Sequence, residues 1–521
     1  MTAAALACLT PGASADHTLQ DLVSPDGGAP YSWDALHMSQ DGQRVLFATQ
    51  EPFDPSDTDT VPDIYERIGE TFTRVAREAG DTTVFQQRRF SLDGSHVFFR
   101  PRFSRTQLVP EDRDITVDVY EAHGGTTRLA SVGELPSNGL FDATLRGASD
   151  DGSRVYFTTA ETLVAQDTDG GYVDVYERSP AGTRLVSGGG NGPFDVTFQL
   201  ASAAGATVVF YTEEQLVVAD TDTERDLYAN SPAGTELVST GPVPSSGGFF
   251  VGHAISPAGD RVVFSTFSGL VPADTDGRLD IYAREGGTTE LISTGPTSTN
   301  APVDVTFDDA SEDATVVLFH TTEHLTTGHT WSDFGYYRRA GGATDLIVPV
   351  DLNQETIPIS SGDGSRAFYE THTKVLPDDT DPSRDIYQWH AGTTTRVSTG
   401  PQDTDWRNPT LGGASFDGER VFFRTNARHV PADTSLDWDI YERYQGQTML
   451  LTDNPVPQEG ADAWVEAVSR DGIHVLVGTR QSLDPADTDG GTQDAYLYSA
   501  PSPLASFSTV ERVDDFTRAG Q

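Results

Sequence analysis

Aspartates recur along this chain in one short pattern, D-x-D-x-x-x-D, and they are the residues best placed to do chemistry. Five copies keep this spacing, and two carry one extra residue before the last aspartate. Alternate aspartates in a tight loop turn their carboxylates into one concavity, and a third that opens the next strand can close it. Hard oxygen ligands in such an arrangement suit Ca²⁺, which takes about six to eight of them. We therefore expect calcium sites at Asp57, Asp59 and Asp63; Asp112, Asp114 and Asp118; Asp167, Asp169 and Asp174; Asp220, Asp222 and Asp226; Asp274, Asp276 and Asp280; Asp379, Asp381 and Asp385; and Asp487, Asp489 and Asp494.

Crowding of like charge favours a bound ion in these loops. Seven loops with three carboxylates each hold 21 of the 79 acidic residues, and few arginines lie nearby in the sequence, namely Arg113, Arg225, Arg278 and Arg384. Carboxylates this close repel one another and raise each other's pKa. The alternative is that the aspartates only form Asx turns and start strands. High environmental salt would also screen the charge.

Two copies of the loop depart from the pattern. One keeps Asp433 and Asp439 but has Ser435 in the middle and adds Asp437. The other has lost its carboxylates, with His329, Trp331 and Gly335 at the three positions and His320 and His324 close by. Clustered imidazoles can bind a transition metal. The alternative is sequence drift in a unit that no longer has to keep the aspartates of the ion loop.

An internal repeat supplies the elements that position these loops. Each unit reads S-x-D-G-x-R-V-x-F, then the aspartate loop, then D-[IV]-Y and G-T-T-x-L-[VI]-S. Nine tyrosines close the units at intervals of 50 to 56 residues: Tyr65, Tyr120, Tyr176, Tyr228, Tyr282, Tyr337, Tyr387, Tyr441 and Tyr496. Repeats of this length with no linker between them indicate one continuous array.

Each unit is expected to form four short strands. In the third unit these are 141–148, 154–159, 174–178 and 183–187, because apolar residues alternate there and Gly and Asp mark the turns. Many four-stranded units predict an all-β fold, a single β-propeller of about nine blades, with eight or ten left open. Thr18 to Ser24 matches the fourth strand of a unit, so we expect it to complete the last blade and close the ring. The competitor for that place is Leu504 to Val510.

The repeat resembles the WD40-like (TolB-type, PD40) propeller family of bacterial extracytoplasmic proteins. The resemblance rests on segments such as 148–157, 255–264 and 414–423, and it covers nearly the whole chain. It implies a propeller and an extracytoplasmic location. TolB itself is similar to a six-bladed ring fused to a second domain, so its role with the Pal lipoprotein does not carry over to nine units.

The charge of the chain and its N-terminal segment indicate which partners it can bind and in which compartment it is expected. A net charge of −45 excludes extended contact with nucleic acid and disfavours anionic membrane surfaces, and no stretch is long and apolar enough for a transmembrane helix. Residues 1–15 resemble a signal peptide, complete or truncated at its start. Its cleavage would remove the single cysteine, Cys8, unless Cys8 is lipidated. The propeller is then expected over 16–500, with a tail over 501–521.

No compact catalytic motif stands out. The S-x-D-G segments are interpreted as turns, and H-E-x-x-H, G-x-S-x-G and P-loop patterns are missing. His37, His253 and Trp464 fall on first strands, where they can face the central channel or fill it. The sequence thus favours a non-catalytic secreted or surface scaffold that binds a protein or a polysaccharide and holds Ca²⁺. The alternative is a polysaccharide hydrolase or lyase with its site in the channel.

Overall fold

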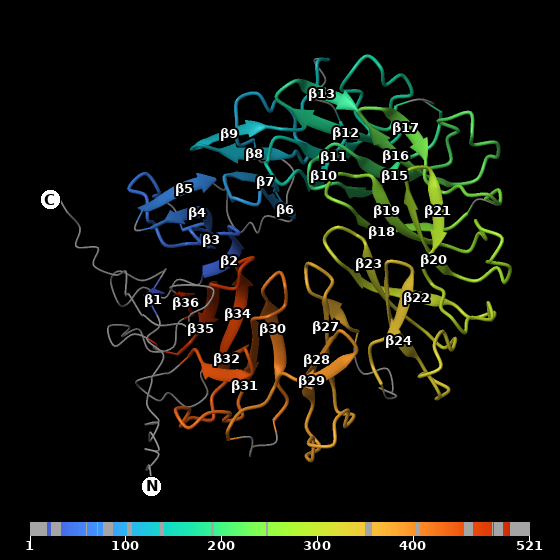
Figure 1. Ribbon diagram of the computed structural model, residues 1–521. Helices are drawn as coiled ribbons and strands as arrows, with labels where there is room; N and C mark the ends of the chain where they lie inside the picture. Colours follow the sequence, from blue (N-terminus) through green and yellow to red (C-terminus); the bar gives the residue numbers. More distant parts are fainter. Residues whose placement is uncertain are drawn as a thin grey trace, which may run out of the picture.

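Nine four-stranded antiparallel sheets stand around one axis in the computed structural model (Figure 1). The structure describes residues 18–21 and 33–500, apart from 59, 70, 77–86, 102–106, 136–139, 189–191, 246–247, 350–356, 403–406, 453–461, 482 and 484–492. All secondary structure in these residues is β-strand. A membrane-spanning helix is therefore not found among them. The predicted all-β propeller of nine blades is confirmed.

The strands run from the axis outward in each blade. Blades 1 to 3 contain β2 (Trp33–Met38), β3 (Arg44–Thr49), β4 (Asp63–Ile68) and β5 (Thr71–Ala76); β6 (Gln87–Phe90), β7 (His96–Arg100), β8 (Tyr120–His123) and β9 (Thr126–Leu129); and β10 (Thr144–Ala148), β11 (Val155–Thr159), β12 (Asp174–Ser179) and β13 (Gly182–Leu185). Blades 4 to 6 contain β14 (Thr197–Ala201), β15 (Val208–Thr212), β16 (Asp226–Ser231) and β17 (Gly234–Leu237); β18 (Phe250–Ile255), β19 (Arg261–Thr266), β20 (Asp280–Glu285) and β21 (Thr288–Leu291); and β22 (Val305–Ala310), β23 (Val316–Thr321), β24 (Gly335–Ala340) and β25 (Ala343–Leu346). Blades 7 to 9 contain β26 (Ile359–Ser360), β27 (Arg366–Thr371), β28 (Asp385–His390) and β29 (Thr393–Arg396); β30 (Thr410–Ala414), β31 (Val421–Thr425), β32 (Asp439–Tyr444) and β33 (Gln447–Leu450); and β34 (Ala463–Val468), β35 (His474–Thr479), β36 (Asp494–Ser499) and β1 (Thr18–Asp21).

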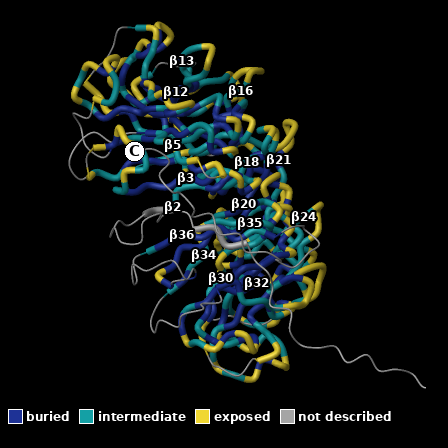
Figure 2. Tube along the Cα trace, turned by 90° about the vertical axis from the view of Figure 1, so that its left-hand side faces the viewer, coloured by how far each residue is buried: buried dark blue, intermediate teal, exposed yellow. Residues whose placement is uncertain are grey.

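The hydrophobic core lies between neighbouring blades. The second and third strands of each sheet are buried, whereas exposed residues lie on the loops and hairpins (Figure 2). The closing tyrosine of every unit is fully buried and, in most blades, stacks on the aromatic residue opposite it in the second strand, as Tyr176 does on Phe157 with ring centroids 5.8 Å apart. Flat rings stacked between sheets fill this space with little loss of rotamer freedom. The strands predicted for the third unit are confirmed within three residues at their ends.

The S-x-D-G segment is a turn that also packs one blade on the next. In the third blade, Ser149 Oγ donates to Asp151 at 2.6 Å and accepts the Arg154 N–H at 3.0 Å. Gly152 has a φ of 68°, and a Cβ at this position would lie 2.4 Å from His96 Cγ of the preceding blade. Glycine is needed here both for the turn and for the close approach. The interpretation of S-x-D-G as a structural turn is confirmed.

Backbone hydrogen bonds join these turns into a ring around the axis, which we call the collar. Eight amide-to-carbonyl bonds of 2.7 to 3.4 Å link one blade to the next: Gln40 to Leu92, Leu92 to Asp150, Asp150 to Ala203, Ala204 to Pro257, Glu312 to Gly362, Asp363 to Phe416, Phe416 to Arg470 and Arg470 to Gln40. The corresponding donor from blade 5 to blade 6 would be Pro257, which has no N–H. Because only backbone atoms take part, the second residue of S-x-D-G is free to vary.

The last blade is completed by the N-terminal strand. β1 pairs antiparallel with β36, with Thr18 opposite Ser499 and Asp21 opposite Tyr496. The collar also closes from Arg470 to Gln40 at 3.2 Å. The predicted closure by the N-terminal strand is confirmed, and the competing segment 504–510 lies outside the described residues. In Figure 1, β1 and β2 accordingly lie beside β36 and β34.

Removal of residues 16–26 should destabilise the whole ring. It deletes β1 and leaves the polar groups of β36 unpaired at a sheet edge, at about 1 kcal/mol for each interstrand hydrogen bond lost. We expect a lower melting temperature and a greater tendency to aggregate, both measurable by calorimetry with light scattering. Deletion of 504–510 is the matched comparison. An unchanged melting curve for the first variant would contradict the closure by β1.

Candidate metal sites in the aspartate loops

The aspartate loops all lie on one face of the ring. Each joins the second strand of a blade to the third, and the linker to the next blade lies on the same side because the strands are antiparallel. We call this the loop face, whereas the S-x-D-G turns and the collar lie on the opposite face. Nine blades thus bring equivalent loops together on one surface.

Five of the seven predicted triads converge in space. In each, one carboxylate oxygen from every member lies within 4.8 Å of the others: Asp112, Asp114 and Asp118; Asp167, Asp169 and Asp174; Asp220, Asp222 and Asp226; Asp274, Asp276 and Asp280; and Asp379, Asp381 and Asp385. The first and third members are buried and the middle one is half-buried. The predictions for Asp59, Asp487 and Asp489 concern residues outside the described ones.

Fixed partners hold the first and third aspartates. The first accepts a hydrogen bond from the closing tyrosine eight or nine residues later, as Asp379 Oδ2 does from Tyr387 at 2.7 Å. The third accepts one from the last serine of the repeat, as Asp280 Oδ1 does from Ser293 at 2.5 Å. The same serine Oγ accepts the N–H of Ile281 at 3.0 Å. The protein thus fixes one oxygen of each of these carboxylates. The other oxygen has a weaker protein partner in some loops, as Asp220 Oδ1 accepts the N–H of Asp222 at 3.2 Å.

Several of the remaining oxygens are buried without any hydrogen-bond partner. These are Asp118 Oδ2, Asp167 Oδ1, Asp274 Oδ1 and Asp379 Oδ1, on residues that are only 4 to 8 % exposed. Asp169 Oδ1 is also buried without a hydrogen-bond partner. A buried carboxylate oxygen without a partner carries its full desolvation cost. A cation inside the triad would remove that cost.

The third aspartates titrate far from their ordinary range. Burial raises the pKa of Asp118, Asp174 and Asp280 to about 7, against the lowering effect of the serine hydrogen bond and with a further rise from the neighbouring aspartates. Burial also raises the pKa of Asp226 and Asp385, to about 6. The metal-free loops therefore hold their negative charge poorly.

In two loops an arginine lies close to the aspartates, although it is not one of the arginines that neighbour the loops in the sequence. In blade 1, Arg74 Nη1 lies 3.0 Å from Asp63 and 3.8 Å from Asp57. In blade 7, Arg396 Nη1 lies 3.4 Å from Asp385. Both arginines lie on the fourth strand, eleven residues after the aspartate, opposite the third strand in the register. That spacing was readable in the sequence once the hairpin was placed.

Blade 6 fills its loop with an imidazole ring. His329 Nδ1 accepts the hydroxyl of Tyr337 at 2.6 Å, where an aspartate does so in other blades, and His329 Nε2 donates to the carbonyl of Asp333 at 3.0 Å. A Cβ at Gly335 would lie 2.6 Å from His329 Nδ1, so the third position must be glycine. The ring of His324 lies 4.2 Å from that of His329, but His320 pairs instead with Asp308 at 2.6 Å. The three histidines therefore do not converge, and both nitrogens of His329 are already bonded.

Blade 8 has a serine hydroxyl where the aspartate triads have the middle carboxylate. Ser435 Oγ donates to Asp439 Oδ2 at 3.0 Å, and Thr452 donates to Asp439 Oδ1 at 2.8 Å. Asp433 accepts the Tyr441 hydroxyl, as its equivalents do elsewhere. Asp437 is buried in the same loop. Blades 1, 6, 7 and 8 thus each supply a protein group that the described residues of the triads in blades 2 to 5 do not have.

The first strands carry polar residues whose partners belong to the same blade or to the neighbouring one. His253 stacks on Phe307 with ring centroids 4.3 Å apart, and its Nε2 meets Ser265 Oγ at 2.9 Å. Burial lowers the pKa of His253 to about 4, so it is neutral near pH 7. His37 likewise stacks on Phe90 of the next blade at 5.2 Å. The two histidines pack between blades, and the Trp464 indole donates to Glu466.

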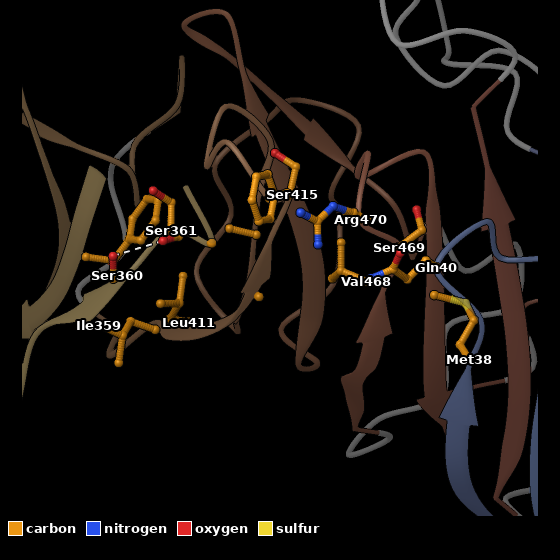
Figure 3. Close-up of a pocket in the computed structure, with 15 residues that line it drawn as sticks. Met38, Gln40, Ile359, Ser360, Ser361, Leu411, Ser415, Val468, Ser469 and Arg470 are labelled. Carbon is orange, nitrogen blue, oxygen red and sulfur yellow. Dashed lines mark hydrogen bonds between the residues drawn. The ribbon is translucent and has the colours of Figure 1, made fainter. Parts of the chain in front are cut away.

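A cavity of about 320 Å³ opens where the first strands of blades 7 to 9 and 1 approach the collar. Met38, Ile359, Leu411 and Val468 line it, and Arg470 is its one charged lining residue (Figure 3). Arg470 is already held by Glu312 of blade 6 at 2.5 Å. This lining contains no paired acid and base.

Comparisons with known proteins bear on the fold. No protein-family model matches the chain, and no curated protein sequence does. Similar solved structures include one from a study of two prolyl endopeptidases (15% identity, TM-score 0.37, 77% of this chain and 55% of that one). Others are the β-propeller domain of the Trilobed protease from Pyrococcus furiosus (13%, 0.32, 72% and 100%) and an oligogalacturonate lyase in complex with manganese (12%, 0.34, 94% and 95%). This chain spans about half the length of the first.

Proposed function

We propose that this chain is a non-catalytic, secreted or surface-exposed scaffold whose aspartate loops hold Ca²⁺ and stiffen a binding face. The observation that carries the proposal is the set of buried carboxylate oxygens without partners inside the triads. Oxygens that lie within 4.8 Å of one another fit around an ion with oxygen ligands at about 2.3–2.6 Å. Backbone carbonyls and water would complete the shell.

Comparison among the blades supports a cation over simple turns. If the loops were only Asx turns, all copies would tolerate the same side chains. Instead, the other described loops contain a guanidinium in blades 1 and 7, an imidazole in blade 6 and a hydroxyl in blade 8. Each substitute occupies the loop or donates to its carboxylates. The open triads of blades 2 to 5 lack such a group and are the sites we expect Ca²⁺ to fill.

An extracytoplasmic location is part of this proposal, and the same chemistry and the sequence support it. Calcium sites made of three carboxylates suit surroundings where the ion is plentiful. The N-terminal segment resembles a signal peptide, and the repeat resembles those of extracytoplasmic TolB-type proteins. With Cys8 removed, the mature chain would have no thiol to oxidise.

A hydrolase or lyase in the central channel is the second candidate. It is favoured by bulges in the first strands, which redirect side chains and are common beside active sites. Such bulges occur in seven of the nine first strands and, among others, place Arg146, His253 and Asp308 at the extra position. Against this, His253 bonds to Ser265 and Asp308 to His320, each within its own blade. We therefore place the scaffold first.

Direct calcium titration of one altered blade tests the proposal. Replacement of Asp274, Asp276 and Asp280 by asparagine keeps the shape of the loop and removes its charge. Calorimetric titration should show one fewer bound Ca²⁺ than in the unaltered chain. Asp333→Asn is the control, because it removes a charge from the blade 6 loop that we expect to hold no ion. Equal numbers of bound ions in the triple variant and the unaltered chain would reduce the loops to turns.

A further inference from the structure

Large apolar side chains are exposed on one arc of the loop face. Of the twelve in the described residues, eight lie in the loops and linkers of blades 2 to 5. Five of these are aromatic and are 38 to 47 % exposed: Phe141, Tyr172, Phe194, Phe249 and Phe267. Blades 2 to 5 are adjacent in the ring, from β6 to β21 (Figure 1).

Aliphatic side chains extend the same surface. Val218 is 98 % exposed, Leu140 87 % and Ile115 60 %. Val218 lies two residues before Asp220, and Ile115 lies directly after Asp114, so both belong to aspartate loops. In the described loops of the other blades on this face, Ile357 and Leu436 are the only large apolar side chains that are exposed. Exposed apolar groups this concentrated mark interaction sites on soluble proteins.

Hydrogen bonds attach these linkers to the loops that hold the triads. Val173, which lies between Tyr172 and Asp174, donates its N–H to Asp195 Oδ1 at 2.8 Å, and Val196 donates to the Val173 carbonyl at 2.7 Å. Tyr172 and Phe194 therefore flank one bonded pair beside the triad of blade 3. In blade 2, Val117 donates to Asp142 Oδ1 at 2.9 Å, next to Phe141. An ion that orders the loop would order the aromatic side chains as well.

The aromatic residues of the last blade in this arc also contact each other. The rings of Phe249 and Phe267 lie with centroids 5.5 Å apart, although one is in the linker and the other follows β19. Each keeps nearly half of its surface exposed. Rigid aromatic groups of this kind are the residues that most often anchor protein interfaces.

We propose that the loop face of blades 2 to 5 is a docking surface for a protein partner that presents basic side chains around an apolar centre, and that bound Ca²⁺ keeps the surface in order. The calcium dependence rests on the proposed function, whereas the surface itself does not. With a net charge of −45, a second copy of this chain would be repelled. Carboxylates around the apolar groups favour basic side chains at the rim of the partner. Aliphatic groups as exposed as Val218 favour an apolar protein surface over a sugar.

A random peptide library displayed on phage supplies a defined probe. Selection on the immobilised full chain in millimolar calcium should enrich peptides that combine Lys or Arg with apolar residues. Replacement of Phe141, Phe194 and Phe249 by serine should weaken their binding at least tenfold. The same substitution at Ile357 and Leu436 is the matched control and should change binding by less than twofold. Melting curves establish that both variants are folded.

The outcomes separate the surface from its calcium dependence. Peptides that lack basic residues, or that bind the serine variant of blades 2 to 5 unchanged, would overturn the docking surface. If EDTA leaves peptide binding intact while the serine variant loses it, the surface stands and the role of calcium is wrong. Loss of peptide binding both in EDTA and in the serine variant supports the docking surface and its dependence on calcium. Failure of any peptide to enrich on the unaltered chain would also overturn the docking surface, and calcium titration, done separately, then still reports on the ion sites.

Discussion

Millimolar calcium should raise the melting temperature of this protein well above its value in EDTA. Each ion that binds only the folded chain adds about 2.7 kcal/mol when free calcium is 100 times its dissociation constant. Four open triads in blades 2 to 5 would add their contributions, because they lie in separate loops. Differential scanning calorimetry in EDTA and in calcium measures the effect.

Sodium chloride at matched ionic strength is the control for this experiment. Salt screens the repulsion among the 79 acidic residues without occupying a site. Magnesium is a second control, because it is smaller and demands near-octahedral geometry. A rise that sodium chloride reproduces would mean that the loops need only screening, and that the charge of the chain is an adaptation to salt.

In EDTA, the stability of the protein should fall as the pH rises from about 4 to about 7. Asp118, Asp174 and Asp280 have a folded pKa of about 7, well above the ordinary 3.8, because they are buried near other carboxylates. A raised pKa means that the folded state holds its proton more tightly than the unfolded state. The stabilisation is complete below the unfolded pKa and is lost as the pH passes the folded one. At about 1.36 kcal/mol per pKa unit, each residue contributes up to about 4 kcal/mol.

Calcium should remove or reverse this dependence of stability on pH, because a bound ion favours the ionised carboxylates.

The aspartates of the S-x-D-G turns change the stability with pH in the opposite direction, but at lower pH. Hydrogen bonds in the turn lower the pKa of Asp93 to about 2 despite partial burial. Their contribution is lost only below the ordinary pKa. Asp280→Asn should flatten the pH profile in EDTA. Thermal unfolding between pH 4 and pH 8 with and without calcium checks both statements, and a metal-free protein whose stability rises over this range would contradict them.

The repeat was sufficient to predict the architecture because each unit obeys local rules. Period-two alternation, the S-x-D-G turn and the buried tyrosine specify four strands wherever they occur, and Thr18 to Ser24 matched the one strand missing from the last blade. The position of the aspartates in the loop was also readable. Five triads converge because the loop itself is short.

Which group balances the charge of each loop could not be read from neighbouring residues. Arg113, Arg278 and Arg384 are close in sequence, yet the arginines that reach the carboxylates are Arg74 and Arg396 on the outer strand. Register across the hairpin decides that contact. The roles of Tyr387 and Ser398 as donors to Asp379 and Asp385 depend on the same pairing.

The amino-acid sequence was enough to predict the strand pattern, a ring of about nine blades and the spacing of the carboxylates, because the repeat and its local turns are visible in the order of the residues. The fold was needed to show which oxygens are buried without a partner and which loops contain an arginine or a histidine of the protein. It was also needed to show that, among the described residues, the exposed aromatic side chains lie in blades 2 to 5. Those properties depend on how one blade packs against the next. Residues about 50 positions apart become neighbours there, and no local pattern records which of them will meet.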